Sequence, residues 1–357
     1  MEKEDYVVTD RDGIVENRHK VHAAITDASG LLSFAVGDPM RMTLARSVAK
    51  PVQALAILET GAFEKFGLDD ADLALVCGSH NSEDRHISRA RAMLDKIQSK
   101  EEDMKCGGHP ALLDSVNRAW AKKDYYPTAL CSNCSGKHVG MLAGAKAIDA
   151  DTADYHLPTH PMQLQVKKAV EELSGLETEN VHWAVDGCGL IAPALPLLYI
   201  AKIFASMASA ADSVARGMAE SERTHALARV YHAMAKYPEM VGGEGRFCTR
   251  LMEVYKGVVI GKLGAEGCYG IGIRSRNTQP VTHNVPSEID DSLGIAVKIE
   301  DGNIGVLYTA VVEILRQRQI GTPEQLQELA DFHRPSIVNT RGVVTGHTYP
   351  SFYLRPQ

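Results

Sequence analysis

Apolar and polar positions change their spacing along the chain, and the changes predict three stretches of different structure. Residues 5–36 alternate as β-strands do and contain turn signals at 10–13 and 27–30, which predicts a meander of two or three antiparallel strands. A helix is expected from about Ser47 to Gly61, since Pro51 is tolerated within a first turn. Helical spacing then dominates residues 82–236, with helices expected at 86–98, 138–148, 162–173 and twice more between 196 and 236.

The last third of the chain returns to β-like runs. These runs lie at 258–260, 269–273 and 295–299, and amphipathic helices follow at 304–318 and 323–332. We therefore expect an α/β fold with an α-rich middle part, in which a sheet built from both chain ends is flanked by helices. The sheet part would comprise residues 1–70 and 255–357, and the helical part residues 71–254. The two parts would form a single compact unit with an active site at their junction.

Composition restricts the kind of partner. The 357 residues are 45% hydrophobic and 23% charged, which is typical of a folded globular protein. With 38 basic and 45 acidic residues the net charge is −7, and no basic run is long enough to follow a phosphate backbone. We therefore expect a small-molecule ligand and no nucleic acid or membrane partner.

Targeting signals and cysteine usage favour a cytoplasmic protein. The acidic N-terminus does not resemble a signal peptide. The longest apolar stretch, residues 190–211, is interrupted by Pro193, Pro196 and Lys202 and is not expected to span a bilayer. Seven cysteines are scattered along the chain, so free thiols in a reducing compartment are favoured over a disulfide framework.

Ser47 and Lys50 form the sharpest local motif. Three positions apart at a helix start, their hydroxyl and amine share one helical face, as in a Ser-Lys nucleophile pair. The positive end of the helix dipole and burial would both lower the pKa of Lys50 and help it act as a base. The alternative is that Ser47 only caps the helix and Lys50 is a solvated first-turn residue.

Two more motifs follow in the order used by penicillin-recognising serine enzymes. Ser79-His80-Asn81 matches an S-x-N pattern, and Lys262-Leu263-Gly264 matches K-x-G after a strand-like run. In such enzymes the second hydroxyl relays protons and the lysine lies on an edge strand beside the substrate. A polar turn at Ser79 and a surface charge at Lys262 are the alternatives.

A third group contains cysteines. Cys131 and Cys134 form a C-x-x-C motif before His138, and Cys188 follows some fifty residues later between two glycines. This set is compatible with tetrahedral zinc, although a redox pair or buried thiols remain alternatives.

With these motifs the chain resembles the rhizobial-type, or class 3, L-asparaginases of the asparaginase II family. The resemblance spans the whole chain and depends on several collinear segments, which are residues 46–51, 79–80, 106–110, 133–138, 160–161, 186–189, 237–239, 262–267 and 339–342. It implies a fold similar to serine β-lactamases and glutaminases.

The resemblance also implies roles for individual residues. The family pattern suggests two Ser-Lys tandems, Ser47 with Lys50 and Ser79 with Lys262. It suggests one zinc per chain, bound by Cys134, Lys137 and Cys188. It also suggests a substrate pocket lined by Arg46, His80, His138 and Asp186. Cys131 stands where relatives are not expected to have cysteine and could compete with Lys137 for the metal.

The resulting hypothesis is an amidohydrolase that converts L-asparagine to L-aspartate and ammonia through a serine acyl-enzyme activated by lysine. Zinc would position the substrate, and a homodimer is the default expectation for the oligomer. One alternative is a glutaminase or another Ser-Lys amidase or β-lactam hydrolase. An alternative of a different class is a thiol-based metal-binding or redox module.

Overall fold

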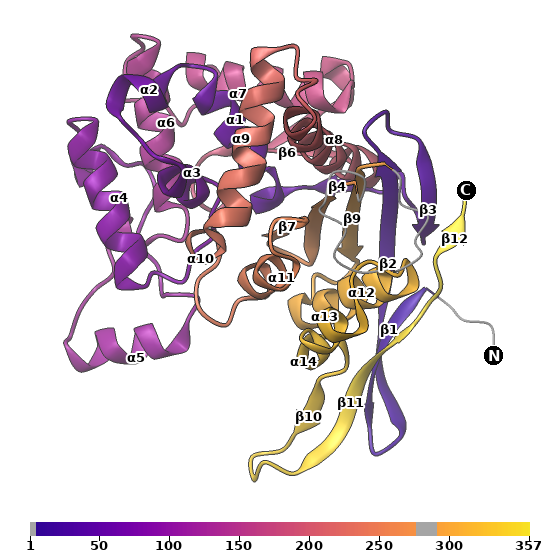
Figure 1. Ribbon diagram of the computed structural model, residues 1–357. Helices are drawn as coiled ribbons and strands as arrows, with labels where there is room; N and C mark the ends of the chain where they lie inside the picture. The colour runs from indigo at the N-terminus through magenta and orange to yellow at the C-terminus, as the bar shows by residue number, and fades with distance from the viewer. Residues whose placement is uncertain (1–4, 276–290) are drawn as a thin grey trace.

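A large antiparallel sheet forms one side of the molecule in the computed structural model, which describes residues 5–275 and 291–357 (Figure 1). Its main path runs β10-β11-β1-β2-β9-β8-β7, while β3 pairs with β2 and β12 pairs with β3. The strands are β1 (Tyr6–Arg11), β2 (Ile14–Asp27), β3 (Leu32–Val36), β7 (Val259–Gly264), β8 (Cys268–Ile273), β9 (Leu293–Ile299), β10 (Ser336–Val338), β11 (Val344–Ser351) and β12 (Arg355–Pro356).

Both ends of the chain contribute strands to this sheet. The meander expected in residues 5–36 is confirmed as β1, β2 and β3, with β1 and β3 each antiparallel to β2. Val8 of β1 lies opposite Arg18 of β2 on one side and Tyr349 of β11 on the other, so the first strand is paired with the last long one. β7 ends the path and is therefore an edge strand.

Helix α8 (Leu197–Ala215) packs closely on the sheet, against β2, β8 and β9. Gly294 of β9 permits this contact, because an added Cβ would lie 1.8 Å from the carbonyl oxygen of Ala201. Among the described residues α8 is also the helix long and apolar enough to cross a bilayer, but most of it is buried inside the protein, as in a core helix. Helix α12 (Ile304–Gln317) packs against β8, β9 and β11.

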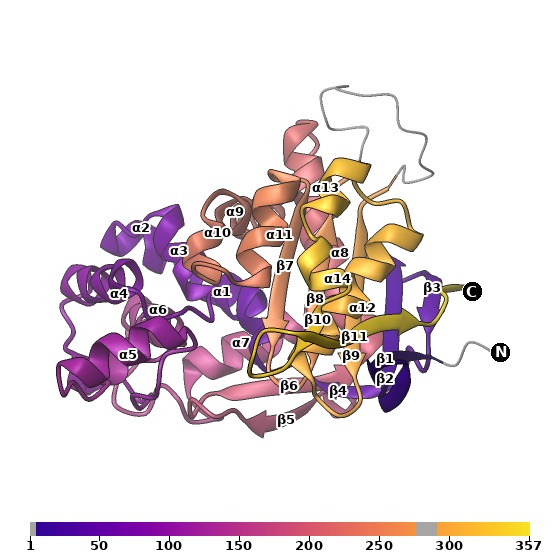
Figure 2. The ribbon, with the colours of Figure 1, turned by 90° about the horizontal axis from the view of Figure 1, so that it is seen from below.

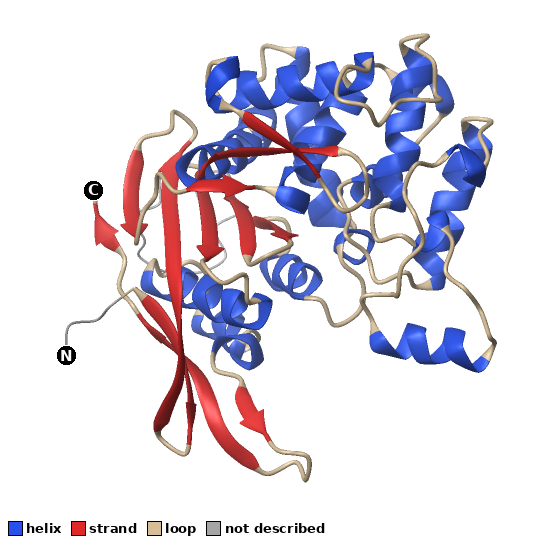
Figure 3. Cartoon of the chain, turned by 180° about the vertical axis from the view of Figure 1, so that it is seen from behind, coloured by secondary structure: helices blue, strands red, loops and turns tan. Residues whose placement is uncertain are grey.

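Most other helices gather on the side away from the sheet (Figure 3). They confirm the helices expected between residues 47 and 236, and Gly175 ends one of them at φ +71°, in the left-handed conformation that glycine accepts easily. These helices are α1 (Lys50–Leu58), α2 (Ala62–Phe66), α3 (Asp70–Val76), α4 (Asp84–Lys96), α5 (Asp114–Lys122), α6 (Ser135–Ala147), α7 (Pro161–Ser174) and α9 (Glu222–Lys236). They are followed by α10 (Pro238–Val241), whereas α11 (Phe247–Tyr255) packs against β7, and α13 (Pro323–Gln327) and α14 (Ala330–His333) lie beside α12 next to the sheet (Figure 1).

Two strands of a small second sheet lie inside the stretch that we expected to be mainly helical, and the third precedes that stretch. Its order is β4-β6-β5, with β4 (Met42–Leu44), β6 (Ile191–Pro196) and β5 (His182–Val185), and Figure 2 shows it along one side of the molecule. β6 is largely buried and leads into the apolar helix α8 without a break in hydrophobicity. The sequence therefore shows one apolar run where the structure has a strand and a helix, and periodicity alone does not separate them.

Candidate active site

Ser47 lies on a short 3-10 helix, η1 (Arg46–Ala49), that continues directly into α1. The preceding residue Arg46 has φ +50°, an uncommon backbone conformation for a residue with a side chain. The Ser47 hydroxyl is partly exposed and makes no hydrogen bond to any residue in the described part of the chain. It is thus the more accessible of the two candidate serines.

The Ser79 hydroxyl lies between two lysine amines. Its oxygen is 3.1 Å from the Nζ of Lys50 and 2.9 Å from the Nζ of Lys262. Both lysines are almost wholly buried, and Ser79 is 7% exposed. The Ser79-Lys262 tandem is therefore in hydrogen-bonding contact, whereas Lys50 reaches Ser79 and does not bond to Ser47.

Carbonyl oxygens hold both amines in place. Lys50 Nζ donates to the backbone oxygen of Gly78 and, at 3.4 Å, to that of Asn133. Lys262 Nζ donates to its neighbour Leu263 at 2.7 Å. A carbonyl only accepts hydrogen bonds, so each of these contacts uses an N–H group of the amine. Another bonding position of each amine nitrogen then faces the Ser79 hydroxyl.

Lys262 is adapted to accept a proton. Burial and the nearby Lys50 amine lower the pKa of Lys262 from 10.5 to about 7. In its neutral form it can take the Ser79 O–H proton through its lone pair while Lys50 donates an N–H to the same oxygen. Ser79 is therefore placed between a hydrogen-bond donor and a base.

Arg46 and Asp186 form a side-chain ion pair beside Ser47. The Asp186 side chain is 7% exposed and comes from the turn that joins β5 to β6. Burial by itself would raise the pKa of Asp186, but Lys137, the Gly187 N–H and Arg46 outweigh it and lower the pKa. Asp186 is thus an anion, and Arg46 supplies a cation next to the exposed serine.

The two histidines expected in the substrate pocket are buried and neutral. Desolvation lowers the pKa of His80 far below its ordinary value and that of His138 to about 3. His80 contacts the Ser135 hydroxyl at 2.9 Å through Nε2 and accepts the Ser82 N–H through Nδ1. His138 Nδ1 lies 2.7 Å from the hydroxyl of Tyr155, while its Nε2 is buried without a partner in the described chain.

The three residues expected to bind zinc meet between the start of α6 and the β5–β6 turn. Lys137 Nζ lies 3.1 Å from the sulfur of Cys188, and the Cys134 thiol is hydrogen-bonded to the same sulfur. The Cys134 hydrogen bond, with help from Lys137, lowers the pKa of Cys188 to about 4, and the same bond raises the pKa of Cys134 to about 12. Burial acts to lower the pKa of Lys137, but the two sulfurs outweigh it and raise that pKa.

This donor set is compatible with zinc, because two sulfurs and one amine nitrogen converge and thiolate sulfur is a preferred zinc ligand. Binding would require Cys134 and Lys137 to lose protons. The described residues contain no group of three or more His, Cys, Asp or Glu side chains placed to hold a metal, so a site here depends on the lysine.

A protein-family model described as L-asparaginase II matches residues 7–350, which is almost the whole chain. The chain belongs to the L-asparaginase II family. A search of curated proteins finds no match. Membership of the L-asparaginase II family makes this protein an asparaginase-type amidohydrolase that acts on a small-molecule substrate.

In this L-asparaginase II family member, Cys131 lies apart from the cluster of Cys134, Lys137 and Cys188. Its sulfur contacts the Tyr125 hydroxyl at 3.2 Å and the Thr128 hydroxyl at 4.0 Å. Within the described residues it makes no hydrogen bond to Cys134 or Cys188, so the C-x-x-C spacing does not bring its two sulfurs into contact. All seven cysteines are free thiols.

Sequence reasoning missed several groups that hold the site of this L-asparaginase II protein. The carbonyl oxygens of Gly78 and Asn133 anchor Lys50, but a backbone atom leaves no residue-type signal. Tyr155 orients His138, and no spacing relates the two. His109 contacts Asn133, and the only available signal was its place in the Gly-Gly-His-Pro segment that resembles the family.

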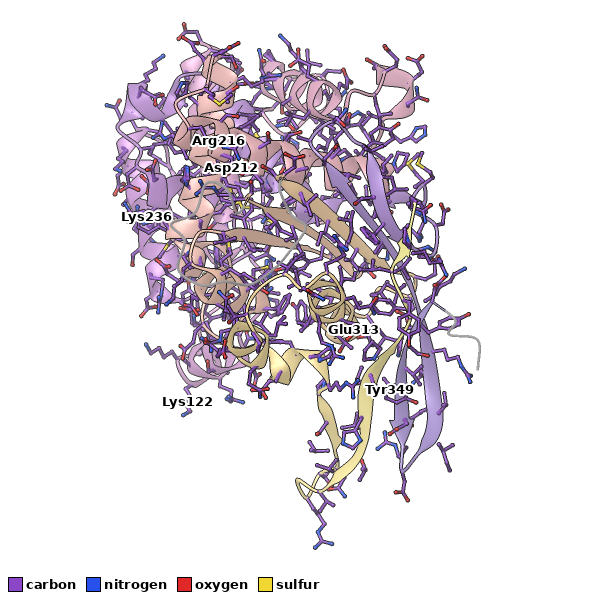
Figure 4. All side chains as sticks on the ribbon, turned by 45° about the vertical axis from the view of Figure 1, so that its right-hand side comes forward. Lys122, Asp212, Arg216, Lys236, Glu313 and Tyr349 are labelled. Carbon is purple, nitrogen blue, oxygen red and sulfur yellow. The ribbon has the colours of Figure 1, made fainter. Side chains whose placement is uncertain are left out.

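A polar cavity of about 210 Å³ lies elsewhere, at the C-terminal end of α8. Asp212 and Arg216, labelled in Figure 4, are among its lining residues. Asp212 accepts hydrogen bonds from Arg274, at 2.7 Å, and from the Ser275 N–H, at 2.6 Å. None of the predicted site residues lines this cavity, so it gives no support for placing the asparaginase chemistry there.

Proposed function

We propose that this protein hydrolyses L-asparagine to L-aspartate and ammonia through a serine acyl-enzyme. The observation that carries the proposal is the Ser79 hydroxyl shared by Lys50 and Lys262, with the accessible Ser47 hydroxyl one helical turn before Lys50. Two buried amines around one serine supply a donor and an acceptor of protons without a histidine or carboxylate.

In the first half of the reaction, Ser47 Oγ attacks the side-chain amide carbon of asparagine. Lys50 takes the Ser47 proton when the substrate is bound, since catalytic hydrogen bonds often form only in that complex. The Ser79 hydroxyl gives its proton to the departing nitrogen, which leaves as ammonia, and Ser79 takes the Ser47 proton from Lys50 in exchange. Water then attacks the ester while the Ser79-Lys262 pair takes a proton from the water, with neutral Lys262 as the final acceptor. That proton returns to the Ser47 oxygen as the ester C–O bond breaks, which releases L-aspartate and restores the Ser47 hydroxyl. Backbone N–H groups at the start of η1, including that of Ser47, would hold the oxyanion.

The substrate would lie among the charged and neutral groups that surround Ser47. Arg46 and Asp186 are placed to bind the carboxylate and ammonium groups of an amino acid. The hydroxyl of Tyr155 accepts the Lys105 N–H at 2.8 Å, so its hydrogen is free for Nδ1 of His138. His138 would then carry its own hydrogen on the unpartnered Nε2, which suits an acceptor on the substrate. His80 would support the pocket from its hydrogen bond to Ser135.

We also propose that one zinc ion per chain is held by Cys134, Lys137 and Cys188. A bound zinc ion would supply a positive centre that orients the amino-acid end of the substrate. Lys137 would bind as a neutral amine, with Cys134 held at the start of α6 and Cys188 in the β5–β6 turn. The Ser-Lys groups already supply the nucleophile, so the reaction does not require a metal hydroxide.

At a coarser level, we propose a serine β-lactamase-like arrangement, a homodimer and a cytoplasmic location. The first of these is supported by Lys262 on the edge strand β7, beside the helix that carries Ser47. The division into a sheet part (1–70 and 255–357) and a helical part (71–254), with the site at their junction, is part of the same proposal. Absence of a disulfide in the described chain is compatible with a reducing compartment.

The deciding experiment measures ammonia release from asparagine by the wild type and by Ser47→Ala. The Ser47 hydroxyl makes no hydrogen bond to the described residues, so the variant should unfold at the wild-type temperature while losing turnover. Ser206→Ala on α8 is the matched control and should keep full activity. If Ser47→Ala retains more than about one hundredth of wild-type turnover and Ser79→Ala does not, Ser79 is the nucleophile.

The same assay separates the alternatives. A panel that adds glutamine and a β-lactam tests whether the substrate is another amide, since each would be cleaved by the same serine. A thiol-based function predicts that Ser47→Ala leaves activity unchanged while Cys134→Ala and Cys188→Ala abolish it. That outcome would overturn the acyl-enzyme proposal.

A further inference from the structure

We propose that His109 is a positioning residue for the Ser-Lys machinery: it holds Asn133 so that the Asn133 carbonyl oxygen faces the Lys50 amine. The inference depends on the proposed function, because Lys50 is the base in that mechanism. His109 lies in the loop between η2 (Glu101–Asp103) and α5, far from Lys50 in sequence. It does not touch the lysine itself and acts through Asn133.

The contacts of His109 define its protonation state. Nδ1 lies 2.7 Å from the carbonyl oxygen of Pro110, which can only accept, so Nδ1 carries the hydrogen. Nε2 lies 3.0 Å from the backbone nitrogen of Asn133 and 2.9 Å from its side-chain nitrogen. Both of these groups donate, so Nε2 must offer its lone pair. His109 is therefore a neutral imidazole with the proton on Nδ1.

Asn133 carries the effect of His109 to the catalytic groups. Its carbonyl oxygen accepts from Lys50 Nζ at 3.4 Å and from the His80 N–H at 3.3 Å. Its side-chain oxygen lies 3.1 Å from the Cys134 sulfur. Each polar group of Asn133 is thus engaged, and His109 is the one partner in the described chain that holds its N–H donors.

The geometry of Lys50 explains why this matters for catalysis. Two carbonyl oxygens, from Gly78 and Asn133, anchor the amine and direct its third valence at Ser79. If the Asn133 backbone loses its histidine partner, its half-buried N–H must find another acceptor and the peptide shifts. Lys50 then keeps one anchor and no longer points consistently at Ser79. The loss should appear in kcat, because proton transfer fails, more than in KM.

Three variants test whether His109 positions Lys50 through Asn133. His109→Gln keeps an acceptor close to the position of Nε2 and should retain kcat within about threefold, while His109→Leu removes the acceptor and should lower kcat about tenfold or more with KM little changed. His160→Leu is the control, because His160 also accepts a backbone N–H, from Met162 at 3.0 Å at the start of α7. It should lower stability and leave kcat unchanged.

The outcomes separate positioning from a merely structural role. Equal loss of kcat in the Gln and Leu variants, or unchanged kcat in the Leu variant, overturns the proposal. If the Leu variant raises KM at constant kcat, His109 acts through Cys134 on the cluster of Cys134, Lys137 and Cys188. That result also overturns the proposal.

A second measurement does not depend on activity. Two-bond ¹H–¹⁵N correlation of labelled histidine should show His109 with a protonated Nδ1 and a bare Nε2. Hydrogen exchange of the Asn133 amide should be protected in the wild type and His109→Gln, and faster in His109→Leu. If the wild type releases no ammonia from asparagine, the proposed function fails, and these two readouts still decide the role of His109. A protonated Nε2 in the wild type would overturn it.

Discussion

Two amines share one serine oxygen, and they cannot both carry a charge at low cost. Lys50 and Lys262 are both buried, and each would repel the other if both were ammonium groups. Burial and Lys50 lower the pKa of Lys262 to about 7, so Lys262 is mainly neutral above pH 7. A neutral Lys262 can accept a proton from Ser79.

We expect the rate to follow the protonation of Lys262. The amine accepts a proton only when neutral, so kcat should rise as pH increases through about 7 and reach a plateau above it. The measurement is kcat for asparagine between pH 5 and 9. A rate that falls as pH rises through 7 would show that the charged form of Lys262 is the active one.

Lys262→Met should remove turnover and make the protein more stable at neutral pH. The unfolded chain keeps the lysine proton up to about pH 10.5, while the folded state releases it near 7, so the buried amine destabilises the fold most below pH 7. Each pKa unit corresponds to about 1.4 kcal/mol, and the gain should vanish above about pH 10.5. Denaturant unfolding at pH 6 and pH 10.5 checks the sign. Lys298→Met on β9 is the control for activity and should remain active.

Lys50→Arg should be as damaging as Lys50→Ala. A guanidinium group does not lose its proton in this pH range, so it cannot take a proton from a serine even if it fills the same position. Lys202→Arg on α8, where the amine donates to the Ser174 carbonyl at 2.9 Å, should leave turnover unchanged. Near wild-type rates in Lys50→Arg would make Lys50 an electrostatic group and not a base.

At the scale of elements, the site depends on how closely β7 approaches η1. Gly264 at the end of β7 makes this contact possible, because a Cβ there would lie 2.7 Å from the Ala45 carbonyl oxygen and 2.9 Å from the Val48 side chain. Those two residues flank Ser47 in the chain. The strand that carries Lys262 and the short helix that carries Ser47 are thereby held against one another.

Gly264→Ala should therefore reduce activity more than it reduces stability. The added methyl group must push η1 away from β7, and displacements of this size in an active site cost about 10- to 100-fold in rate. Gly305→Ala in α12 is the matched control, since its Cβ would meet only Asn303 at 3.5 Å. Turnover and the unfolding temperature should be measured for both. Full activity in Gly264→Ala would mean that η1 tolerates the shift.

At the scale of the whole molecule, the cluster of Cys134, Lys137 and Cys188 joins two segments that are distant in the chain. Cys134 and Lys137 come from the start of α6, and Cys188 comes from the turn after β5. The sulfur and amine contacts already hold these segments together in the metal-free arrangement. A zinc ion at this place would replace two protons, those of Cys134 and Lys137.

Purified protein should contain about one zinc per chain, and its removal should raise KM for asparagine more than it lowers kcat. Zinc affinity should decrease as the pH is lowered, because the pKa values of Cys134 and Lys137 are both raised and both groups must deprotonate to bind zinc. Metal analysis and kinetics of Cys188→Ala, with Cys131→Ala as the control, check this. Zinc lost from Cys131→Ala but kept in Lys137→Ala would contradict the assignment.

Local pattern was sufficient for much of this protein. Alternation and helical spacing predicted β1 to β3, α7 and α12, whose apolar positions recur over a length that a short window of sequence can register. The helix expected at 138–148 is confirmed as α6, although α6 is buried on nearly all sides. The order of the Ser47, Ser79 and Lys262 motifs indicated a serine acyl-transfer enzyme. The resemblance to the asparaginase II family implied an amidohydrolase, and the family match confirms that family. Such signals are carried by neighbouring residues and need no knowledge of distant ones.

Long-range contacts determine the features of the fold and the site that local pattern did not predict. Spacing placed Lys50 beside Ser47, but the structure turns its amine to Ser79, because the carbonyl oxygens that anchor it come from Gly78 and Asn133. The low pKa of Lys262 arises from burial and from Lys50, neither of which a local motif reveals. β6 was also missed, since its pairing with β4 and β5 depends on residues far along the chain. Proton transfer and strand pairing are properties of three-dimensional proximity, and only folding brings these groups together.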